Sequence, residues 1–161
     1  MALSRAIAII ALGAAASACV VFPVPRVIAP EVSGVLLNDG KPVANAEIEL
    51  VAALAPSDAS SEIPPGSSHA VARTDANGKF KVGPLTGVKT VHTYGDELLG
   101  FYIVIRAGNK ELIGFTYSEI ASVPSKLSGV CDLAKARSVG NQVTYCDHDR
   151  LEKLKMVTDD S

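Results

Sequence analysis

The sequence has no tryptophan and only four phenylalanines and four tyrosines among its 161 residues. Aromatic side chains are the platforms on which nucleic-acid bases and sugar rings stack, so their scarcity argues against recognition of either. A basic surface is missing as well, because 15 Lys and Arg residues are outnumbered by 17 Asp and Glu residues, for a net charge of −2. Proteins that hold a phosphate backbone need an excess of positive charge. We therefore expect no nucleic-acid partner.

Sequence motifs of several enzyme classes are missing too. The chain has no Gly-x-Ser-x-Gly elbow, which would expose a nucleophilic serine on a sharp turn. It has no His-Glu-x-x-His motif, which would place two zinc ligands on one helix face. No glycine-rich loop leads from a strand pattern into a helix pattern, as a phosphate-binding loop would. We therefore predict a protein that is not an enzyme and that carries no cofactor.

The longest run of small and apolar residues lies at the start of the chain. Arg5 precedes eleven such residues, Ala6 to Ala16, and Ala16-Ser17-Ala18 ends the run. A positive residue, an apolar stretch and a small-x-small site are typical of a cleaved secretory signal peptide. The run is too short for a membrane span, which needs roughly 20 residues, and no later segment is long and apolar enough. We predict a signal peptide over residues 1–18, whose removal leaves 143 residues with a net charge of −3.

Only three cysteines occur, Cys19, Cys131 and Cys146. An exported protein meets an oxidising compartment in which thiols pair, so an odd number leaves one cysteine over. The simplest partition joins Cys131 to Cys146, which are 15 residues apart, and leaves Cys19 for another role. The alternative pairs Cys19 with one of the other two and leaves a free thiol.

The residues around Cys19 indicate what that role is. Ala16-Ser17-Ala18-Cys19 resembles the lipobox of bacterial lipoproteins, in which small residues precede the modified cysteine. The resemblance implies a diacylglyceryl group on the sulfur of Cys19, with fatty acyl chains such as palmitate, and an envelope location. Val20, in place of Asp, favours the outer membrane within that family. The family prefers Leu where this chain has Ala16, so a soluble secreted protein with an unmodified Cys19 is the alternative.

Residues 19–30 are rich in proline, with Pro23, Pro25 and Pro30. Proline fixes its own φ and disfavours helix in the residue before it, so this segment is predicted to be an extended, lipid-anchored tether. At about 3.1 Å per residue, such a tether would hold the domain about 30 Å from the lipid. Because the segment is also apolar, packing on the domain as an edge strand is the alternative.

From residue 31 onward the pattern becomes that of β-strands. Glu47 to Val51 alternates polar and apolar residues, which places Ile48 and Leu50 on the buried face. Residues 79–82 are predicted to place Phe80 and Val82 inward in the same way. The apolar, β-branched run over residues 100–106 predicts a central strand, and residues 112–117 its antiparallel return. Residues 118–142 are weakly patterned, with at most one helical turn near residues 132–137.

Two turn signals divide these strands. Asn38-Asp39-Gly40 is a strong hairpin signal, because Asp-Gly accepts the positive φ that a tight turn requires. Asp75-Ala76-Asn77-Gly78 is the second, and its Asp side chain can bond to the nearby backbone. An EF-hand calcium loop would need a Glu six residues beyond the glycine, where this chain has Pro84. We therefore interpret Gly40, Asp75, Asn77 and Gly78 as structural turn residues.

These segments together resemble a known domain family. Ser33-Gly34-Val35, Gly40-Lys41-Pro42-Val43, Ala46 to Leu50 and Thr74 to Phe80 resemble the carboxypeptidase regulatory-like domain over residues 31–83. The resemblance implies a transthyretin-like (prealbumin-like) β-sandwich of about seven strands. Its motif residues occupy turns and the core, so no catalytic residue carries over. We predict an all-β fold, with one such sandwich over residues 31–161 and a C-terminal region closed by Cys131 and Cys146.

The densest group of possible metal ligands is Asp147-His148-Asp149, followed by Glu152. On a helix, His148 and Glu152 would share one face, but a catalytic zinc site needs a third protein ligand. An exposed acidic turn is the simpler interpretation. A small periplasmic hydrolase or metal-binding protein that uses this cluster is the alternative. His69 and His92 are interpreted as isolated surface histidines.

The functional expectation combines the anchor with the fold. We expect an envelope lipoprotein, tethered to the membrane by its lipid, whose β-sandwich is a non-catalytic module that binds an envelope protein or polymer. A structural accessory subunit of an envelope assembly is a further alternative.

Overall fold

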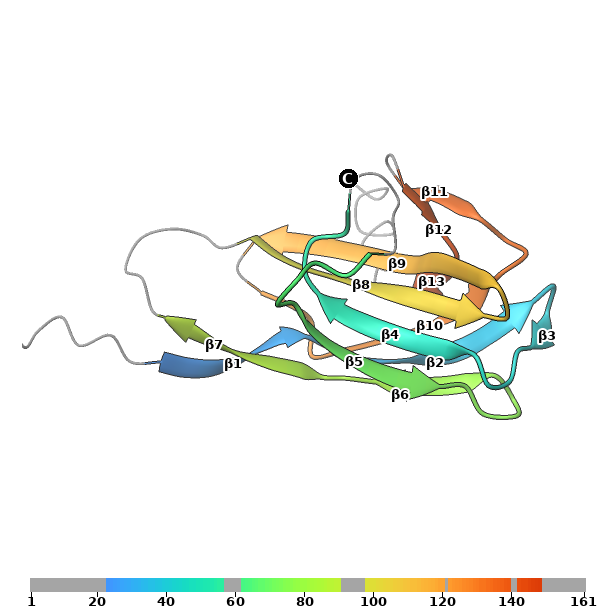
Figure 1. Ribbon diagram of the computed structural model, residues 1–161, viewed down its shortest axis with the longest axis horizontal. Helices are drawn as coiled ribbons and strands as arrows, with labels where there is room; N and C mark the ends of the chain where they lie inside the picture. Colours follow the sequence, from blue (N-terminus) through green and yellow to red (C-terminus); the bar gives the residue numbers. More distant parts are fainter. Residues whose placement is uncertain (1–22, 57–61, 91–97, 121, 140–141, 149–161) are drawn as a thin grey trace, which may run out of the picture.

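The structure is a computed structural model that describes residues 23–56, 62–90, 98–120, 122–139 and 142–148. Within these residues the chain forms thirteen strands and no helix, in two larger sheets and two two-stranded ribbons (Figure 1). The prediction of an all-β sandwich is confirmed. Strands outnumber the expected seven because β1 and several strands of three residues or fewer lie outside the predicted pattern.

The first sheet has the order β5-β4-β8-β9, with every neighbouring pair antiparallel. Its strands are β5 (Ser68–Arg73), β4 (Glu47–Ala52), β8 (Leu98–Ala107) and β9 (Lys110–Ile120). The five residues from Phe101 to Ile105 are all buried, so β8 is apolar on both faces, as a strand covered on both sides must be. The predicted central strand is therefore confirmed.

The second sheet is built around β2 (Glu31–Asn38). On one side of β2 lies β10 (Lys126–Asp132), followed by β13 (Cys146–His148). On the other side lie β6 (Lys79–Val82) and the short β3 (Lys41–Pro42). β10 runs parallel to β2, whereas the other described pairs in this sheet are antiparallel. Parallel neighbours need a long connection, so these two strands are far apart in the sequence.

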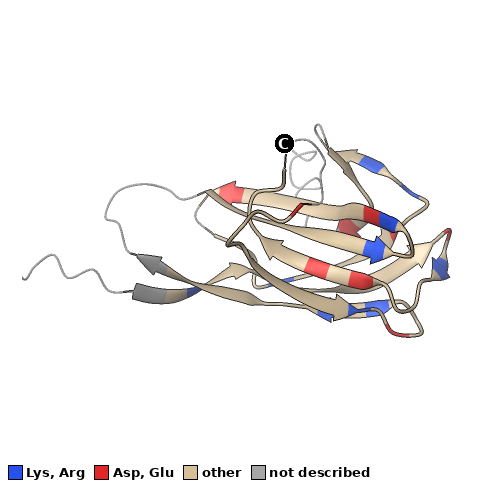
Figure 2. Ribbon diagram, viewed as in Figure 1, with Lys and Arg blue, Asp and Glu red and all other residues tan. Residues whose placement is uncertain are grey.

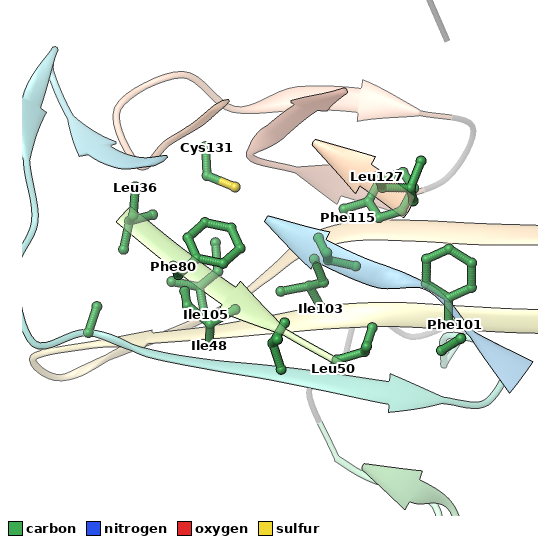
Figure 3. Packing of buried hydrophobic residues seen from close by; sticks show 14 of the residues in the cluster. Leu36, Ile48, Leu50, Phe80, Phe101, Ile103, Ile105, Phe115, Leu127 and Cys131 are labelled. Carbon is green, nitrogen blue, oxygen red and sulfur yellow. The ribbon is translucent and has the colours of Figure 1, made fainter. Parts of the chain in front are cut away.

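The two sheets pack face to face around one apolar core (Figure 3). Ile48 and Leu50 point into it from β4, and Phe80 and Val82 point into it from β6, as their alternation predicts. An aromatic group adds to this packing, since the Phe101 ring lies 4.8 Å from Tyr117 and 5.9 Å from Phe115 between centroids. The side chains labelled in Figure 3 are Leu36, Ile48, Leu50, Phe80, Phe101, Ile103, Ile105, Phe115, Leu127 and Cys131.

Both predicted turns form. Asp39 (φ 52°) and Gly40 (φ 74°) lie in the left-handed region and connect β2 to β3. In the second turn the Asp75 carboxylate accepts the backbone N–H groups of Asn77 and Lys79, each at 2.8 Å. Gly78 has φ 74°, and a Cβ added there would lie 2.4 Å from the Leu36 carbonyl oxygen. This second glycine is therefore required both by its backbone angle and by its neighbour.

The C-terminal region is β-structure where the sequence pattern was weak. Cys131 of β10 lies directly opposite Cys146 of β13, and the two are joined by a disulfide. β11 (Arg137–Val139) and β12 (Gln142–Thr144) form an antiparallel ribbon between these strands. The helical turn suggested near residues 132–137 is wrong. The structure has instead a non-helical turn, in which the Lys135 N–H donates to the Asp132 carbonyl at 2.9 Å, and residues 137–139 are a strand.

The predicted free tether is largely a strand. β1 (Pro23–Ala29) pairs antiparallel with β7 (Leu85–Thr90), and we call this pair the N-terminal ribbon. Both strands of a two-stranded ribbon are edge strands, where proline is tolerated. The edge-strand alternative therefore describes residues 23–29, whereas residues 19–22 lie outside the described part of the chain.

Candidate functional site

Charged side chains gather on the face of the first sheet that points away from the core. We call this group the outer-face network, and Figure 2 shows its acidic residues on β4 beside the basic end of β8. Residues on this face alternate with the core residues Ile48 and Leu50 on β4, and with Ile103 and Ile105 on β8. The members of the network are Glu47, Glu49, His69, Arg73, Arg106 and Glu111.

Glu49 is the centre of the network. Its side chain faces away from the core, as the alternation predicts, yet the residue is only 4% exposed. One carboxylate oxygen accepts a hydrogen bond from the Arg106 guanidinium, and the other lies 3.2 Å from Nδ1 of His69. The hydrogen bond with Glu49 raises the pKa of Arg106 above its ordinary value, so the guanidinium stays charged. The prediction that His69 is an isolated histidine is therefore wrong.

Arg106 joins three carboxylates from neighbouring strands. Besides Glu49, its guanidinium contacts Glu47 at 3.2 Å and Glu111 at 3.1 Å. Glu47 also pairs with Arg73 of β5 at 3.2 Å. Each carboxylate in the network therefore contacts at least one cation, and the contacts connect all four strands of the first sheet.

The network has one arrangement with possible chemistry. A histidine oriented by a buried carboxylate is the geometry of a general acid–base pair. The Glu49 carboxylate contacts both His69 and the Arg106 guanidinium. These contacts pair charged groups that lie on separate strands of the sheet.

A second small core lies on the same face, next to the network. Val51, Tyr102 and Val104 are buried there beneath Ala53, Ala55 and Ile63. The Tyr102 hydroxyl donates to the Glu62 carbonyl at 3.3 Å, and Gln142 donates to the Pro56 carbonyl at 3.1 Å. Burial, with a smaller contribution from the charge of Glu49, raises the pKa of Tyr102. The described parts of the loop between β4 and β5 thus cover the part of this face formed by Val51, Tyr102 and Val104.

A second polar group surrounds Asp132, at the end of β10. Its carboxylate accepts the backbone N–H groups of Asp39 at 2.9 Å and Ala134 at 3.1 Å, and it pairs with Lys135 at 3.3 Å. The Asp39 bond joins this group to the β2–β3 turn. A surface pocket of about 170 Å³ lies beside it, and Arg137 and Asp147 line that pocket as a pair 2.6 Å apart. The charges around this pocket therefore neutralise one another.

The structure describes two of the predicted metal ligands, Asp147 and His148. Asp147 pairs with Arg137, and His148 lies opposite Gly129 at the edge of the second sheet. Asp149, Glu152, His92 and Cys19 lie outside the described residues. Among the residues described, no three His, Cys, Asp or Glu side chains gather as metal ligands do. No helix in that part of the chain is long and apolar enough to cross a membrane.

Sequence reasoning missed Glu49, His69 and Arg106 as a group. Glu49 and Arg106 are ordinary polar residues in β-patterns, and His69 follows a serine-rich loop. The alternation placed Glu49 away from the core, but the register that brings the three together is set between strands. The available signal was a charged residue with apolar neighbours in a predicted strand, such as Glu49 between Ile48 and Leu50.

Comparisons with known proteins leave the family open. No protein-family model matches the sequence, and a search of curated proteins gives no match. Among solved structures, the chain resembles the dioxygenase domain of a dioxygenase carbohydrate-binding protein fusion from Streptomyces sp. SirexAA-E, with 15% identity, 79% of each chain covered and a TM-score of 0.31. It also resembles chlorocatechol 1,2-dioxygenase from Pseudomonas putida, with 13% identity, 75% of this chain and 56% of that chain covered, and a TM-score of 0.27. Similarities this low carry no functional argument.

Proposed function

We propose that the chain is a lipid-anchored protein of the bacterial envelope whose β-sandwich is a non-catalytic interaction module. The observation that carries the proposal is the disulfide between Cys131 and Cys146. It uses two of the three cysteines and leaves Cys19, directly behind Ala16-Ser17-Ala18, as the odd one. Disulfides are typical of exported proteins, so the pairing and the apolar N-terminus support the same route.

Lipid on Cys19 accounts for the odd cysteine and would place the anchor close to β1. The first described strand begins four residues after Cys19, so an anchor there would attach almost directly to the folded domain. Each buried CH₂ of an acyl chain contributes about 0.8 kcal/mol, and two or more chains make a durable anchor. The outer membrane is the destination that Val20 favours in this proposal.

The fold offers an interaction surface at the edge of the first sheet. β5 has a partner strand on one side only within the described sheet, and its Val71 is 53% exposed between His69 and Arg73. An open strand edge can accept an extended segment through backbone hydrogen bonds, with side chains adding specificity. We propose that an envelope protein or polymer docks there.

Mass spectrometry of the mature N-terminus tests the anchor. We expect the protein isolated from its own cells to begin at Cys19 and to carry a diacylglyceryl group. The Cys19→Ala variant should lack that mass and leave the membrane fraction. An unmodified Cys19 at the N-terminus would establish the secreted alternative, and an intact Met1 in the cytosol would exclude both.

Three measurements separate the module from its alternatives. Metal analysis of the purified protein should find less than stoichiometric zinc or calcium; a stoichiometric metal lost in His148→Ala would replace the proposal with a metal-binding or hydrolytic function. Photo-crosslinking in intact cells from position 71, compared with position 54 on a covering loop, should give a product specific to position 71. Co-purification of most of the protein with one large complex would instead favour a structural subunit.

A further inference from the structure

The N-terminal ribbon has one apolar face that the rest of the domain leaves uncovered. In its antiparallel register, Pro25 lies opposite Val88 and Val27 opposite Thr86, so these four residues share a face. All four are exposed, Val88 by 69% and Val27 by 40%. Scattered exposed valines are ordinary, but two on one narrow ribbon with a proline form a continuous apolar strip.

The base of the ribbon is fixed in the sandwich. Ala29 and Leu85, which pair at that end, are buried in the main core. On the opposite face Ile28 packs against Gly87, where an added Cβ would lie 3.0 Å from the Ile28 side chain. The ribbon is therefore a fixed projection whose exposed face has a definite direction. Figure 1 shows its free end at the opposite end of the molecule from β3.

The sequence before the ribbon continues the same apolar character. From Cys19 to Pro25 the residues are Cys-Val-Val-Phe-Pro-Val-Pro, and Arg26 is the first charged residue after Cys19. A linker that holds a domain in water is normally polar or charged, which this segment is not. The four steps from Cys19 to Pro23 span at most about 14 Å, because an extended chain advances about 3.3–3.6 Å per residue.

We infer that the exposed face of the N-terminal ribbon rests on the lipid surface beside the anchor and holds the domain against the membrane. The inference rests on the proposed function, since only a lipid on Cys19 keeps the ribbon within reach of a bilayer. An apolar strip next to an acyl anchor adds a second attachment to the same surface.

The absence of tryptophan makes this placement measurable. A tryptophan introduced by Val88→Trp is the sole indole of the chain and reports its own depth. Val71→Trp is the matched control, because Val71 is also exposed and lies on β5 of the sandwich. The full acylated protein is reconstituted into vesicles of phosphatidylethanolamine and phosphatidylglycerol with brominated acyl chains. We expect quenching at position 88 at least threefold stronger than at position 71, with a blue-shifted emission.

A second reporter guards against a local effect of the first substitution. Thr86 lies on the same exposed face as Val88, so the fluorescence of a Thr86→Trp variant should also be quenched. Mass spectrometry of each preparation gives the acylation state, and circular dichroism confirms the β-fold. If acylated protein shows equal quenching at positions 71, 86 and 88, the inference is wrong while the anchor stands. If Cys19 carries no lipid in cells, the proposed function is wrong and this inference falls with it.

Discussion

At the scale of single residues, two buried carboxylates determine the polar contacts. Glu49 and Asp132 are both more than nine-tenths buried, which is costly for a charged group unless hydrogen bonds and opposite charges replace water. Glu49 accepts a hydrogen bond from Arg106 and lies against His69. Asp132 accepts hydrogen bonds from two backbone N–H groups and pairs with Lys135. Each carboxylate therefore depends on specific partners.

Removing the Arg106 side chain tests the first of these sites. Arg106→Leu leaves the buried Glu49 carboxylate with His69 alone, so we expect the free energy of unfolding to fall by about 2–3 kcal/mol. Arg73→Leu is the control, because its side chain is 60% exposed and exposed pairs contribute less than about 1 kcal/mol. Urea titrations give both values. The double variant Glu49→Leu with Arg106→Leu should recover part of the loss, and equal effects of the two arginines would contradict this account.

Acid titration tests the second site. Burial alone would raise the pKa of Asp132, but the hydrogen bonds from Ala134 and Asp39 and the charge of Lys135 outweigh it and lower the pKa below its ordinary value. A carboxylate whose pKa is lowered by folding stabilises the protein above its unfolded-state pKa, and this stability is lost as the pH falls through the folded value.

We therefore expect the urea midpoint to decrease from about pH 5 to about pH 2. Asp132→Asn should flatten that dependence. Glu31→Gln should flatten it further when combined, because the hydrogen bond with Lys81 lowers the pKa of Glu31 as well. A wild-type midpoint that stays constant over this range would contradict the prediction.

At the scale of elements, turns and the disulfide decide how strands meet. Gly40 and Gly78 have the same φ of 74°, yet only Gly78 lies against another strand, through the Leu36 carbonyl. The positive φ thus explains why glycine is found at both positions. Only at Gly78 would a side chain also collide with a neighbouring atom.

Alanine substitution should separate these two effects. Gly40→Ala meets no atom within 4 Å, so we expect only the cost of a positive φ, about 1 kcal/mol. Gly78→Ala adds a Cβ 2.4 Å from the Leu36 oxygen and should cost more than about 2 kcal/mol. Thermal unfolding of both variants measures the difference. Equal losses would show that the contact with Leu36 relaxes freely.

Removing the disulfide tests the closure of the second sheet. The bond joins residues 15 apart, a loop for which the chain-entropy model gives about 3 kcal/mol, so Cys131→Ser with Cys146→Ser should lose about that much. The single Cys131→Ser variant should leave Cys146 reactive toward thiol reagents. Reactive Cys146 in the oxidised wild type would show that the pairing is wrong.

At the scale of the whole molecule, stability is distributed unevenly. β4 and β8 lie inside the first sheet, with the main core on one face and the small core around Val51, Tyr102 and Val104 on part of the other. β2 lies inside the second sheet between β10 and β6. The N-terminal ribbon contacts the sandwich mainly at its base. Regions with few buried contacts open locally at lower free energy than the core.

Hydrogen exchange followed by mass spectrometry should reveal this gradient in the protein in solution. We expect the slowest exchange in peptides from β2, β4 and β8, and faster exchange in peptides from β1 and β7. The β11–β12 ribbon should also exchange early. Uniform exchange over all strands would indicate that the molecule opens only as a single unit.

The sequence by itself determined the features that depend on a few neighbouring residues. The two turns follow from Asp and Gly chemistry, the inward positions of Ile48, Leu50, Phe80 and Val82 follow from the two-residue period of a strand, and the disulfide follows from counting cysteines. The tertiary structure alone decided the rest. The partners of Glu49, the parallel pairing of β10 with β2 and the strand at residues 23–29 depend on register between distant segments. No local pattern specifies that register, because it is set by how the whole core packs.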